Sequence, residues 1–311
     1  MVEKQEKIIS VDWGSSNLRV NCFDLESSTI LASVDSDDGV LKFRDLEESE
    51  RHRNLLHVLD KKIGLMEFDV AGASNLPVYI SGMASSNLGI VNLPYFKIPV
   101  SKDENCIYKS EIKTESGKNL NIYSGWTNGH DVMRGEETQA IGASKMMSGV
   151  ELFIIPGTHS KHLYYQKGKF LDFITYMTGE FFDLLSKSSI LSVTMTPDHA
   201  ISFGEAFEEG CMLGYKEPLL HSAFSIRSRF VLDGFSGTDA YSFLSGILIG
   251  SELSHIDPAA LQNVCIIGSE GLSSLYQRCM LALYGQSTSI TLMDAKLATC
   301  LGHKFYHQNK L

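Results

Sequence analysis

Apolar and polar positions alternate between residues 7 and 83 in a way that predicts strands and helices in turn. KIISVDWG (7–14) and NLRVNCFDL (17–25) predict a hairpin, and TILASVDS (29–36) predicts a third strand after a Ser-Ser turn. LEESERHRNLLHVLDKKIGL (46–65) carries apolar residues at helical spacing among charged ones, which indicates an amphipathic helix. LPVYISGM (76–83) predicts a buried strand that ends in a glycine.

The second half of the chain repeats this alternation, which is typical of an α/β protein. The predicted elements are a helix over 132–147, a strand, polar turn and second strand over 152–175, a helix over 178–191, helices near 203–215 and 239–255, a strand, glycine-bearing turn and helix over 264–285, and a final strand–helix pair.

The predicted lobes meet near residue 125, because residues 100–125 are polar and turn-rich, with short strands only. We therefore expect an N-terminal lobe over 1–125, joined by a C-terminal helix over 295–311, and a C-terminal lobe over 126–294. ISVDWGSSNLRV and LFIIPGTHSKHLYY, one in each half, share one plan: an apolar strand, a turn of glycine and small hydroxyl residues, and a second strand. This predicts two lobes built alike and facing each other.

The chain has 311 residues, and its 43% hydrophobic and 21% charged content is ordinary for a globular protein. A formal net charge of −10 argues against a nucleic-acid partner, whose phosphates would be repelled. The charged N-terminus predicts no signal peptide, and the apolar stretch at 243–250 is too short to span a bilayer. Six scattered cysteines without a CxxC pair indicate reduced thiols, so a cytoplasmic location without a membrane partner is expected.

The two polar turns have the composition of phosphate sites, because backbone N–H groups converge on an anion in a tight glycine-bearing turn. The first turn is Gly14, Ser15, Ser16 and Asn17, and the second is Gly157, Thr158, His159, Ser160 and Lys161. Polyphosphate also needs Mg²⁺, which prefers one or two carboxylates and several waters, and Asp12 is placed for that role. Either turn taken alone is equally well interpreted as a plain hairpin connection. The presence of both turns favours a phosphate-binding function.

Two other nucleotide motifs are absent, since the sequence contains neither GxxxxGK[ST] nor GxGxxG. A third glycine-bearing turn, IIGSEGLSSLY, places Gly268, Ser269 and Gly271 between a buried strand and a helix. Such a turn permits close approach of a flat ligand or a phosphate to the helix N-terminus. It is a weak signal by itself.

An acidic cluster precedes the second turn, in GHDVMRGEETQ (129–139). Asp131 is predicted to cap the helix, with Arg134, Glu136 and Glu137 in its first turns. The alternative is an ordinary cap with glutamates favoured by the helix dipole. A carboxylate here could accept a hydroxyl proton during phosphate transfer.

A similar polar loop, SGMASSNLG (81–89), follows the strand near residue 80. Ser85, Ser86 and Asn87 offer hydrogen bonds to sugar hydroxyls, and a helix N-cap is the competing interpretation.

Together these motifs resemble the 2-dehydro-3-deoxygalactonokinases, over about residues 8 to 305. The resemblance is carried, in order, by DWGSSNLR, SGMASSNLG, DVMRGEETQ, PGTHSK, DFITYMTGE, FLSGILIGSE and IIGSEGL. MRGEETQ and PGTHSK are specific, whereas DWGSSN is shared with the wider actin-like, sugar-kinase and heat-shock ATPase superfamily.

The resemblance implies an α/β, two-lobed actin-like ATPase (ribonuclease H-like) fold, with duplicated mixed sheets flanked by helices and the active site in the interlobe cleft. It implies ATP-dependent phosphorylation of 2-dehydro-3-deoxy-D-galactonate at its C6 hydroxyl, in D-galactonate breakdown, with ATP and Mg²⁺ as cofactors. The expected partners are this sugar acid and ATP; a homodimer is left open.

Residue roles follow from the same resemblance. Asp12 would organise Mg²⁺, the two turns would cradle the ATP phosphates, and Gly268, Ser269 and Gly271 would lie at the adenosine. The catalytic base would stand at the start of the helix before PGTHSK, with Asp131 the first choice and Glu136 its rival. The expected substrate-binding residues are Arg134, Glu137, Ser85, Asn87 and Arg19; an Arg suits the sugar carboxylate.

Two positions depart from the family pattern. His162 stands where a Trp is expected, which would alter packing near the phosphate turn, and Glu270 stands where a small neutral residue is expected, which would weaken nucleotide binding. Two other functions compete: a kinase for a different sugar or sugar acid on the same scaffold, and a catalytically silent sugar sensor. A silent sensor should have lost Asp12 or the acidic cluster, and both are present.

Overall fold

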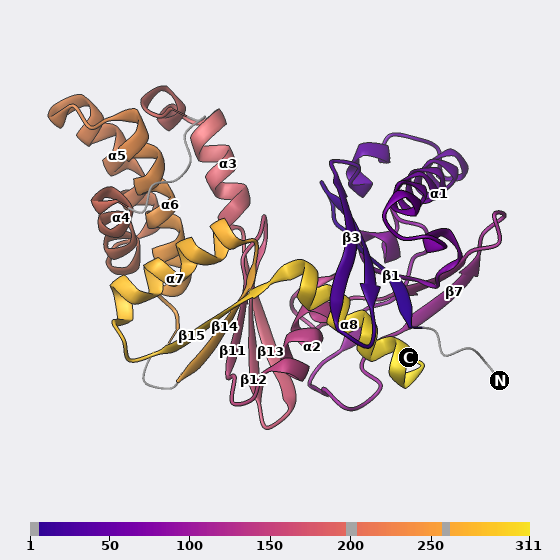
Figure 1. Cartoon of the computed structure of the whole chain (residues 1–311). Coiled ribbons are helices and arrows are strands. Elements are labelled where there is room, and N and C mark those ends of the chain that lie inside the picture. The colour runs from indigo at the N-terminus through magenta and orange to yellow at the C-terminus, as the bar shows by residue number, and fades with distance from the viewer. Residues whose placement is uncertain (1–5, 197–203, 257–261) are drawn as a thin grey trace. The chain divides into compact units, whose positions relative to one another are not determined.

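The computed structural model describes residues 6–196, 204–256 and 262–311, and these form two compact units (Figure 1). Unit 1 comprises residues 1–148, 165–172 and 293–311, and unit 2 comprises 149–164 and 173–292. Residues 126–148, which the sequence placed in the C-terminal lobe, pack with unit 1, as does the C-terminal helix. The assignment of the metal site and the nucleotide turns to the two lobes stays a prediction.

The main sheet of unit 1 is mixed, with strand order β3-β2-β1-β4-β8-β7. β1 pairs antiparallel with β2 and parallel with β4, which in turn pairs parallel with β8. The strands are β1 (Lys7–Trp13), β2 (Leu18–Asp24), β3 (Thr29–Ser36), β4 (Val78–Gly82), β7 (Lys109–Lys113) and β8 (Asn119–Tyr123). A small second sheet, β10-β9-β5, is formed by β5 (Phe96–Lys97), β9 (Trp126–Thr127) and β10 (Val132–Met133).

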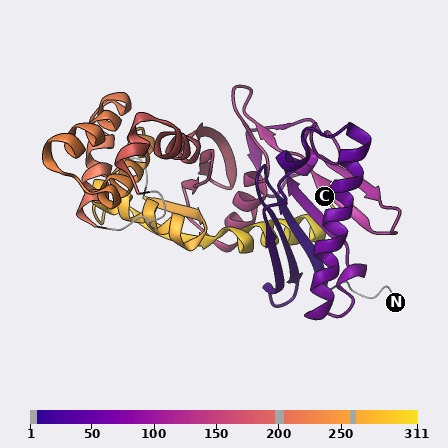
Figure 2. The same cartoon turned by 90° about the horizontal axis from the view of Figure 1, so that it is seen from above.

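Alternation along β1 assigns one helix to each face of this sheet. Ile9 and Val11 share an apolar cluster with Leu55 of α1 (Glu48–Leu65), which runs beside the sheet in Figure 2. Successive side chains of a strand point to opposite faces. Ser10 accordingly contacts His303 of the last helix, α8 (Ala295–Asn309), and Asp12 lies on the same face as Ser10.

Helix α2 (Glu136–Met146) packs against α8 through direct backbone contact at two glycines. A Cβ added at Gly142 would lie 2.0 Å from the Ala298 carbonyl oxygen, and one added at Gly302 would lie 2.2 Å from that of Thr138. Any side chain here therefore forces the helices apart.

Replacement Gly142→Ala is expected to lower the free energy of unfolding by about 1–3 kcal/mol through overpacking. Gly64→Ala in α1 is the matched control, because a Cβ there meets nothing within 4 Å. Alanine in an exposed helical position gains up to about 1 kcal/mol over glycine. Urea midpoints of the two variants would measure the difference; an unchanged midpoint for Gly142→Ala would show that the two helices do not touch there.

The other six-stranded sheet repeats the plan of the first, with order β15-β14-β11-β12-β13-β6. Its strands β11 and β14 belong to unit 2, whereas β6 and residues 165–172 belong to unit 1. β11 pairs antiparallel with β12 and parallel with β14, as β1 does with β2 and β4. The strands are β6 (Val100–Ser101), β11 (Leu152–Ile155), β12 (Ser160–Gln166), β13 (Lys169–Tyr176), β14 (Asn263–Gly268) and β15 (Ser289–Asp294). The prediction of duplicated mixed sheets is thus confirmed.

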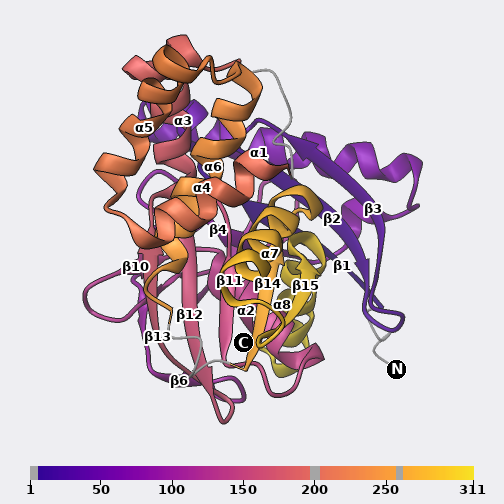
Figure 3. The same cartoon turned by 90° about the vertical axis from the view of Figure 1, so that its left-hand side faces the viewer.

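Helices gather at one end of this second sheet, where Figure 3 shows α4, α5 and α6 together. Two apolar clusters lie among the helices and beneath the sheet. The helices are α3 (Thr178–Ser188), α4 (Glu205–Lys216), α5 (Leu219–Asp233), α6 (Gly237–Leu253) and α7 (Glu270–Tyr284). Short 3₁₀ turns are η1 (Val40–Phe43), η2 (Met66–Phe68), η3 (Ala73–Asn75), η4 (Met83–Ser85) and η5 (Ile190–Thr194).

Most predicted elements are confirmed, and three predictions are corrected. The helix expected over 132–147 begins only at Glu136, because Val132–Met133 pairs with β9. The segment 152–175 holds three strands rather than two, and α5 was not predicted. The start of the helix expected at residue 203 lies outside the described residues. Within the described ranges, no helix has the length and apolar character needed to cross a membrane.

Candidate active site

Asp12 is a largely buried acid of unit 1, near the end of β1. Its carboxylate accepts a 2.8 Å hydrogen bond from Arg19 Nη1 across the hairpin, and 14% of its side-chain surface is exposed. Burial raises the pKa of Asp12, the Arg19 charge opposes this, and the negative charge of Glu136 adds to it. Asp12 and Glu136 therefore interact electrostatically, and a cation between them would relieve their repulsion.

Two glycines let the backbone approach this carboxylate. Gly82, at the end of β4, has φ +95°, and Gly135, before α2, has φ +112°, a region that other residues rarely adopt. A Cβ added at Gly135 would lie 3.3 Å from the Gly82 Cα and 3.7 Å from Asp12 Oδ1. The first turn of α2 thus begins beside Asp12.

Hydrogen bonds that the two glutamates accept from backbone amides define the start of α2. Glu136 Oε2 accepts from the Arg134 amide at 3.0 Å, and both oxygens of Glu137 accept from the Gly135 amide at 2.9 and 2.8 Å. Glu137 is fully buried; burial, and then the Glu136 charge, raise its pKa to about 8. Glu136 is partly exposed, and its negative charge acts on Asp12. Glu137 is buried and stabilises the turn at Gly135 through the hydrogen bonds that it accepts from the Gly135 amide.

Asp131 lies elsewhere, in the turn between β9 and β10. Its Oδ1 accepts from the Val132 amide at 2.7 Å, and its own amide donates to Asn128 Oδ1 at 2.7 Å. The prediction that Asp131 caps the helix is wrong: the N-cap of α2 is Gly135, whose positive φ starts the helix without a side-chain cap.

Arg134 stabilises the polar loop that follows β4 through hydrogen bonds. Its Nη1 donates to the Ser85 carbonyl at 2.5 Å and to the Ser85 hydroxyl at 2.6 Å, its Nη2 donates to the Leu93 carbonyl at 3.2 Å, and its guanidinium lies 4.2 Å from the Tyr95 ring centroid. Ser85 is buried, whereas Asn87 is exposed. The Nε of Arg134 is buried without a hydrogen-bond partner among the described residues.

The backbone carbonyl groups of the first predicted phosphate turn bind it to the segment 39–41. Gly14, Ser15 and Ser16 accept hydrogen bonds from the amides of residues 39–41, at 3.0–3.2 Å. Gly39 has to be glycine, since a Cβ there would lie 2.2 Å from the Ser15 oxygen. Ser16 and Asn17 are exposed.

A buried network of hydroxyl groups and one imidazole lies behind Asp12. His303 bridges Ser10 on β1 and Ser81 on β4, at 2.7 and 2.8 Å, and Ser81 continues to Thr138 on α2 at 2.7 Å. Burial lowers the pKa of His303 to about 3, so the ring is neutral and offers one donor and one acceptor. Ser81 is in register with Asp12, so this network fixes the strand beside the carboxylate.

The second predicted phosphate turn joins β11 to β12 in unit 2. Thr158 and His159 are exposed at its tip, while Ser160 and Lys161 are buried; Lys161 Nζ donates to the His159 carbonyl at 2.9 Å. The first turn of α3 lies against it: the Glu180 amide donates to the Thr158 carbonyl at 3.1 Å, and Glu180 binds His159 at 2.6 Å.

The Gly268 turn lies beside the second phosphate turn. β14 runs parallel to β11, and a Cβ added at Gly268 would lie 3.7 Å from Pro156 and 2.8 Å from Ser273 Oγ. Ser269, Glu270 and Gly271 are exposed at the start of α7, and a Cβ at Gly271 would meet nothing within 4 Å. The predicted site residues therefore form two clusters. Asp12 lies with the start of α2 in unit 1, and the second phosphate turn lies with the Gly268 turn in unit 2.

Comparison with known proteins assigns the family. The sequence profile of the family described as 2-keto-3-deoxy-galactonokinase matches residues 12–303. The chain belongs to this family. The 2-dehydro-3-deoxygalactonokinase of Escherichia coli (strain K12) is 30% identical over 293 residues, 91% of this chain and 92% of that protein. A crystal structure of a candidate 2-dehydro-3-deoxygalactonokinase from Sinorhizobium meliloti has TM-score 0.80 and 29% identity, and covers 98% of this chain and 97% of its own.

The 2-keto-3-deoxy-galactonokinase family is one of kinases, so the expected enzyme class is confirmed. The fold is that of the actin-like ATPases. Component A of the (R)-2-hydroxyglutaryl-CoA dehydratase from Acidaminococcus fermentans has this fold too, with TM-score 0.51 at 15% identity over 98% of both chains.

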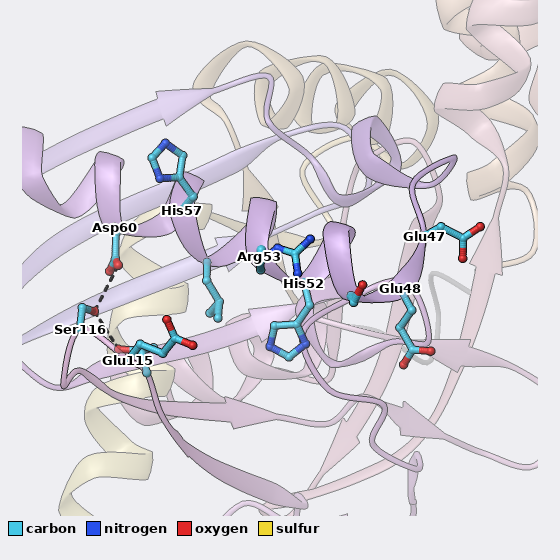
Figure 4. Close-up of a pocket in the computed structure, with 11 residues that line it drawn as sticks. Glu47, Glu48, His52, Arg53, His57, Asp60, Glu115 and Ser116 are labelled. Atoms are coloured by element: carbon cyan, nitrogen blue, oxygen red, sulfur yellow. Dashed lines mark hydrogen bonds between the residues drawn. The ribbon is translucent and has the colours of Figure 1, made fainter.

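A separate groove of about 950 Å³ lies on unit 1 of this family member, between α1 and the turn that joins β7 to β8 (Figure 4). His52, His57 and Asp60 of α1 line it, and Ser116 Oγ donates to Asp60 at 3.2 Å. None of the predicted site residues lines it. This groove is thus distinct from the acids at the end of β1.

Sequence reasoning missed two buried groups beside the predicted site, His303 and Glu252. Both are on helices, and both bind side chains far away in the chain: His303 binds Ser10, and Glu252 binds Ser160 and His162. Glu252 falls inside a quoted motif, FLSGILIGSE, which was the one signal that pointed to it.

Proposed function

We propose that this kinase transfers the γ-phosphate of ATP to the C6 hydroxyl of 2-dehydro-3-deoxy-D-galactonate, with Mg²⁺. The observation that carries the proposal is that α2 begins beside Asp12, within a chain matched to the family over residues 12–303. A Cβ added at Gly135, the residue before Glu136, would lie 3.7 Å from Asp12 Oδ1. We also expect the reaction to take place in the cytoplasm, in keeping with six buried, free cysteines.

Glu136 is the catalytic base in this proposal, in preference to Asp131. A base has to reach the proton that it removes, close to where the phosphate is held. Glu136 interacts with the Asp12 carboxylate and is partly exposed, whereas the Asp131 carboxylate is engaged with its own turn. Gly135, the residue before Glu136, lies close to Asp12, since a Cβ there would be 3.7 Å from Asp12 Oδ1.

Asp12 would hold Mg²⁺. It fits a magnesium site, because it is a buried carboxylate whose charge is unfavourable without a counter-ion beyond Arg19. Within the described ranges no group of three or more His, Cys, Asp or Glu gathers to form a complete metal site. This suits magnesium bound by one or two carboxylates, with phosphate and water as the remaining ligands. When bound, the ion would neutralise the charge of the transferring phosphate.

The two turns would bind the ATP phosphates through their exposed amides and hydroxyl groups. Residues 14–17 offer Ser16 and Asn17, and residues 157–161 offer Thr158 and His159. Lys161 would shape the second turn through its bond to His159 as well as adding positive charge. The turn from Gly268 to Gly271 would lie at the adenosine, as its proximity to Pro156 supports.

Arg134 would orient the sugar acid. Its guanidinium fixes Ser85 and the loop after β4, and its Nε–H is available for a carboxylate oxygen. Asn87 would contact sugar hydroxyls, Glu137 would position Gly135 from within, and Arg19 would hold Asp12 in place.

An ADP-release assay over a panel of 2-keto-3-deoxy sugar acids tests this function. The galactonate compound is expected to give the highest kcat/KM, and chelation of magnesium is expected to abolish turnover. A higher value for another acid would support the kinase of different specificity. Binding of the acid without ADP release would support the silent sensor.

A further inference from the structure

The carboxylate of Glu252, near the end of α6, is buried in the middle of unit 2. Its Oε1 accepts from Ser160 Oγ at 2.6 Å and from His162 Nε2 at 2.8 Å. Its Oε2 accepts from the Tyr276 hydroxyl at 2.6 Å and from Thr178 Oγ1. Both Glu252 and His162 have almost no exposed side-chain surface.

Four donors saturate this carboxylate. An ionised carboxylate has about four lone-pair positions, and each of them has a hydroxyl or imidazole partner here. Burial alone would raise the pKa of Glu252, but the hydrogen bonds from His162, Ser160 and Thr178, with the His162 charge, hold it below the ordinary value. Hydrogen bonds to an ionised group are stronger than those between neutral groups. If the Glu252 carboxylate lost its charge, its four donors would have fewer acceptor positions to share.

The four donors come from the elements that surround the second phosphate turn. Ser160 belongs to the turn itself, and His162 follows it on β12. Thr178 begins α3, whose next residues lie directly on the turn: a Cβ at Gly179 would be 2.5 Å from the Gly157 oxygen. Tyr276 is on α7, the helix that follows the Gly268 turn.

We infer that Glu252 is a positioning residue for the nucleotide: it sets the Gly157–Lys161 turn and α7 in the arrangement that receives ATP, without touching ATP itself. The inference rests on the proposed function, since it takes these two turns as the nucleotide site. In this arrangement His162 serves as a donor to the carboxylate.

A positioning role and a purely stabilising role predict different measurements. A loss of stability alone lowers the fraction of folded protein and leaves the Kd of the folded fraction unchanged. A displaced turn raises the Kd for nucleotide and leaves the KM for the sugar acid unchanged, because the residues proposed to bind the acid lie in unit 1.

The test is Glu252→Gln, which keeps the volume and removes the charge. We expect the Kd for ADP, measured by calorimetry, to rise about tenfold, as for other groups that orient a ligand-binding residue. The KM for the sugar acid should stay within twofold. Glu209→Gln is the control: it removes a carboxylate from an ion pair with Arg229 between α4 and α5, and should leave the Kd for ADP unchanged.

Tyr276→Phe and Thr178→Val keep the charge of Glu252 and remove one hydrogen-bond donor each. They replace Glu252→Gln in the experiment if that variant does not fold. Each is expected to weaken ADP binding about threefold. An ADP Kd within experimental error of the wild type in these folded variants would overturn the inference. A wild-type protein that binds no ADP would instead overturn the proposed function.

Discussion

Glu136→Gln is expected to lower kcat for the sugar acid by about 10²–10⁴-fold, the usual contribution of a general base. Glutamine fills the same space and can still accept the bond from the Arg134 amide that Glu136 makes. Only the proton acceptor is lost, so the Kd for ADP should stay within a few fold. Steady-state kinetics together with nucleotide calorimetry would separate the two quantities.

Asp131→Asn is the matched control for this prediction. Asparagine retains an oxygen for the Val132 amide, so the turn between β9 and β10 should survive and kcat should fall less than about threefold. A large loss in Asp131→Asn with little change in Glu136→Gln would reverse the assignment and make Asp131 the base.

Asp12→Asn is expected to reduce kcat/KM by at least about 10²-fold, because the proposed magnesium ligand and its charge are both removed. The concentration of Mg²⁺ that gives half-maximal activity should rise in step. Arg19→Gln serves as the companion variant: it removes the 2.8 Å bond to the carboxylate but keeps the carboxylate, so its effect should be smaller. Full activity of Asp12→Asn at the wild-type magnesium concentration would contradict the assignment.

The same substitution should leave the metal-free protein as stable as before, or more so, at neutral pH. The pKa of Asp12 is raised in the folded state, so its protonated form is favoured there. The stability that this provides is present below the ordinary carboxyl pKa and is lost as pH rises through the raised one. Asparagine resembles the protonated form at every pH. Thermal unfolding of the metal-free proteins at pH 5 and 8 would measure the gain, which should be larger at pH 8.

Local patterns predicted most of the strands and helices, because alternation and helical spacing depend on near neighbours. The hairpin 7–25 and the helix over 46–65 have clear periods, and both form. The N-cap assigned to Asp131 failed because Gly135, with φ +112°, starts the helix four residues later. A positive φ at one glycine does not show in the hydrophobic pattern.

The candidate site was predictable only in part, for a physical reason. Asp12 and the two turns could be proposed as candidates because Asp, Gly and Asn are depleted within strands. The roles of Glu137, Glu252 and His303 depend on burial and on partners distant in the chain, such as Ser10 for His303. Such contacts appear only when the topology brings the elements together.

The contact between His303 and the first strand has a consequence for synthesis of the protein. Ser10 and Ser81 leave the ribosome early, but the imidazole that pairs with both is carried by the last helix, α8. Until that helix emerges, two hydroxyl groups behind Asp12 have no imidazole partner, and the face of α2 that packs on α8 is uncovered. A chain terminated before residue 295 would contain every acid and turn proposed here for catalysis, yet the nascent strands would lack the final element that fixes them.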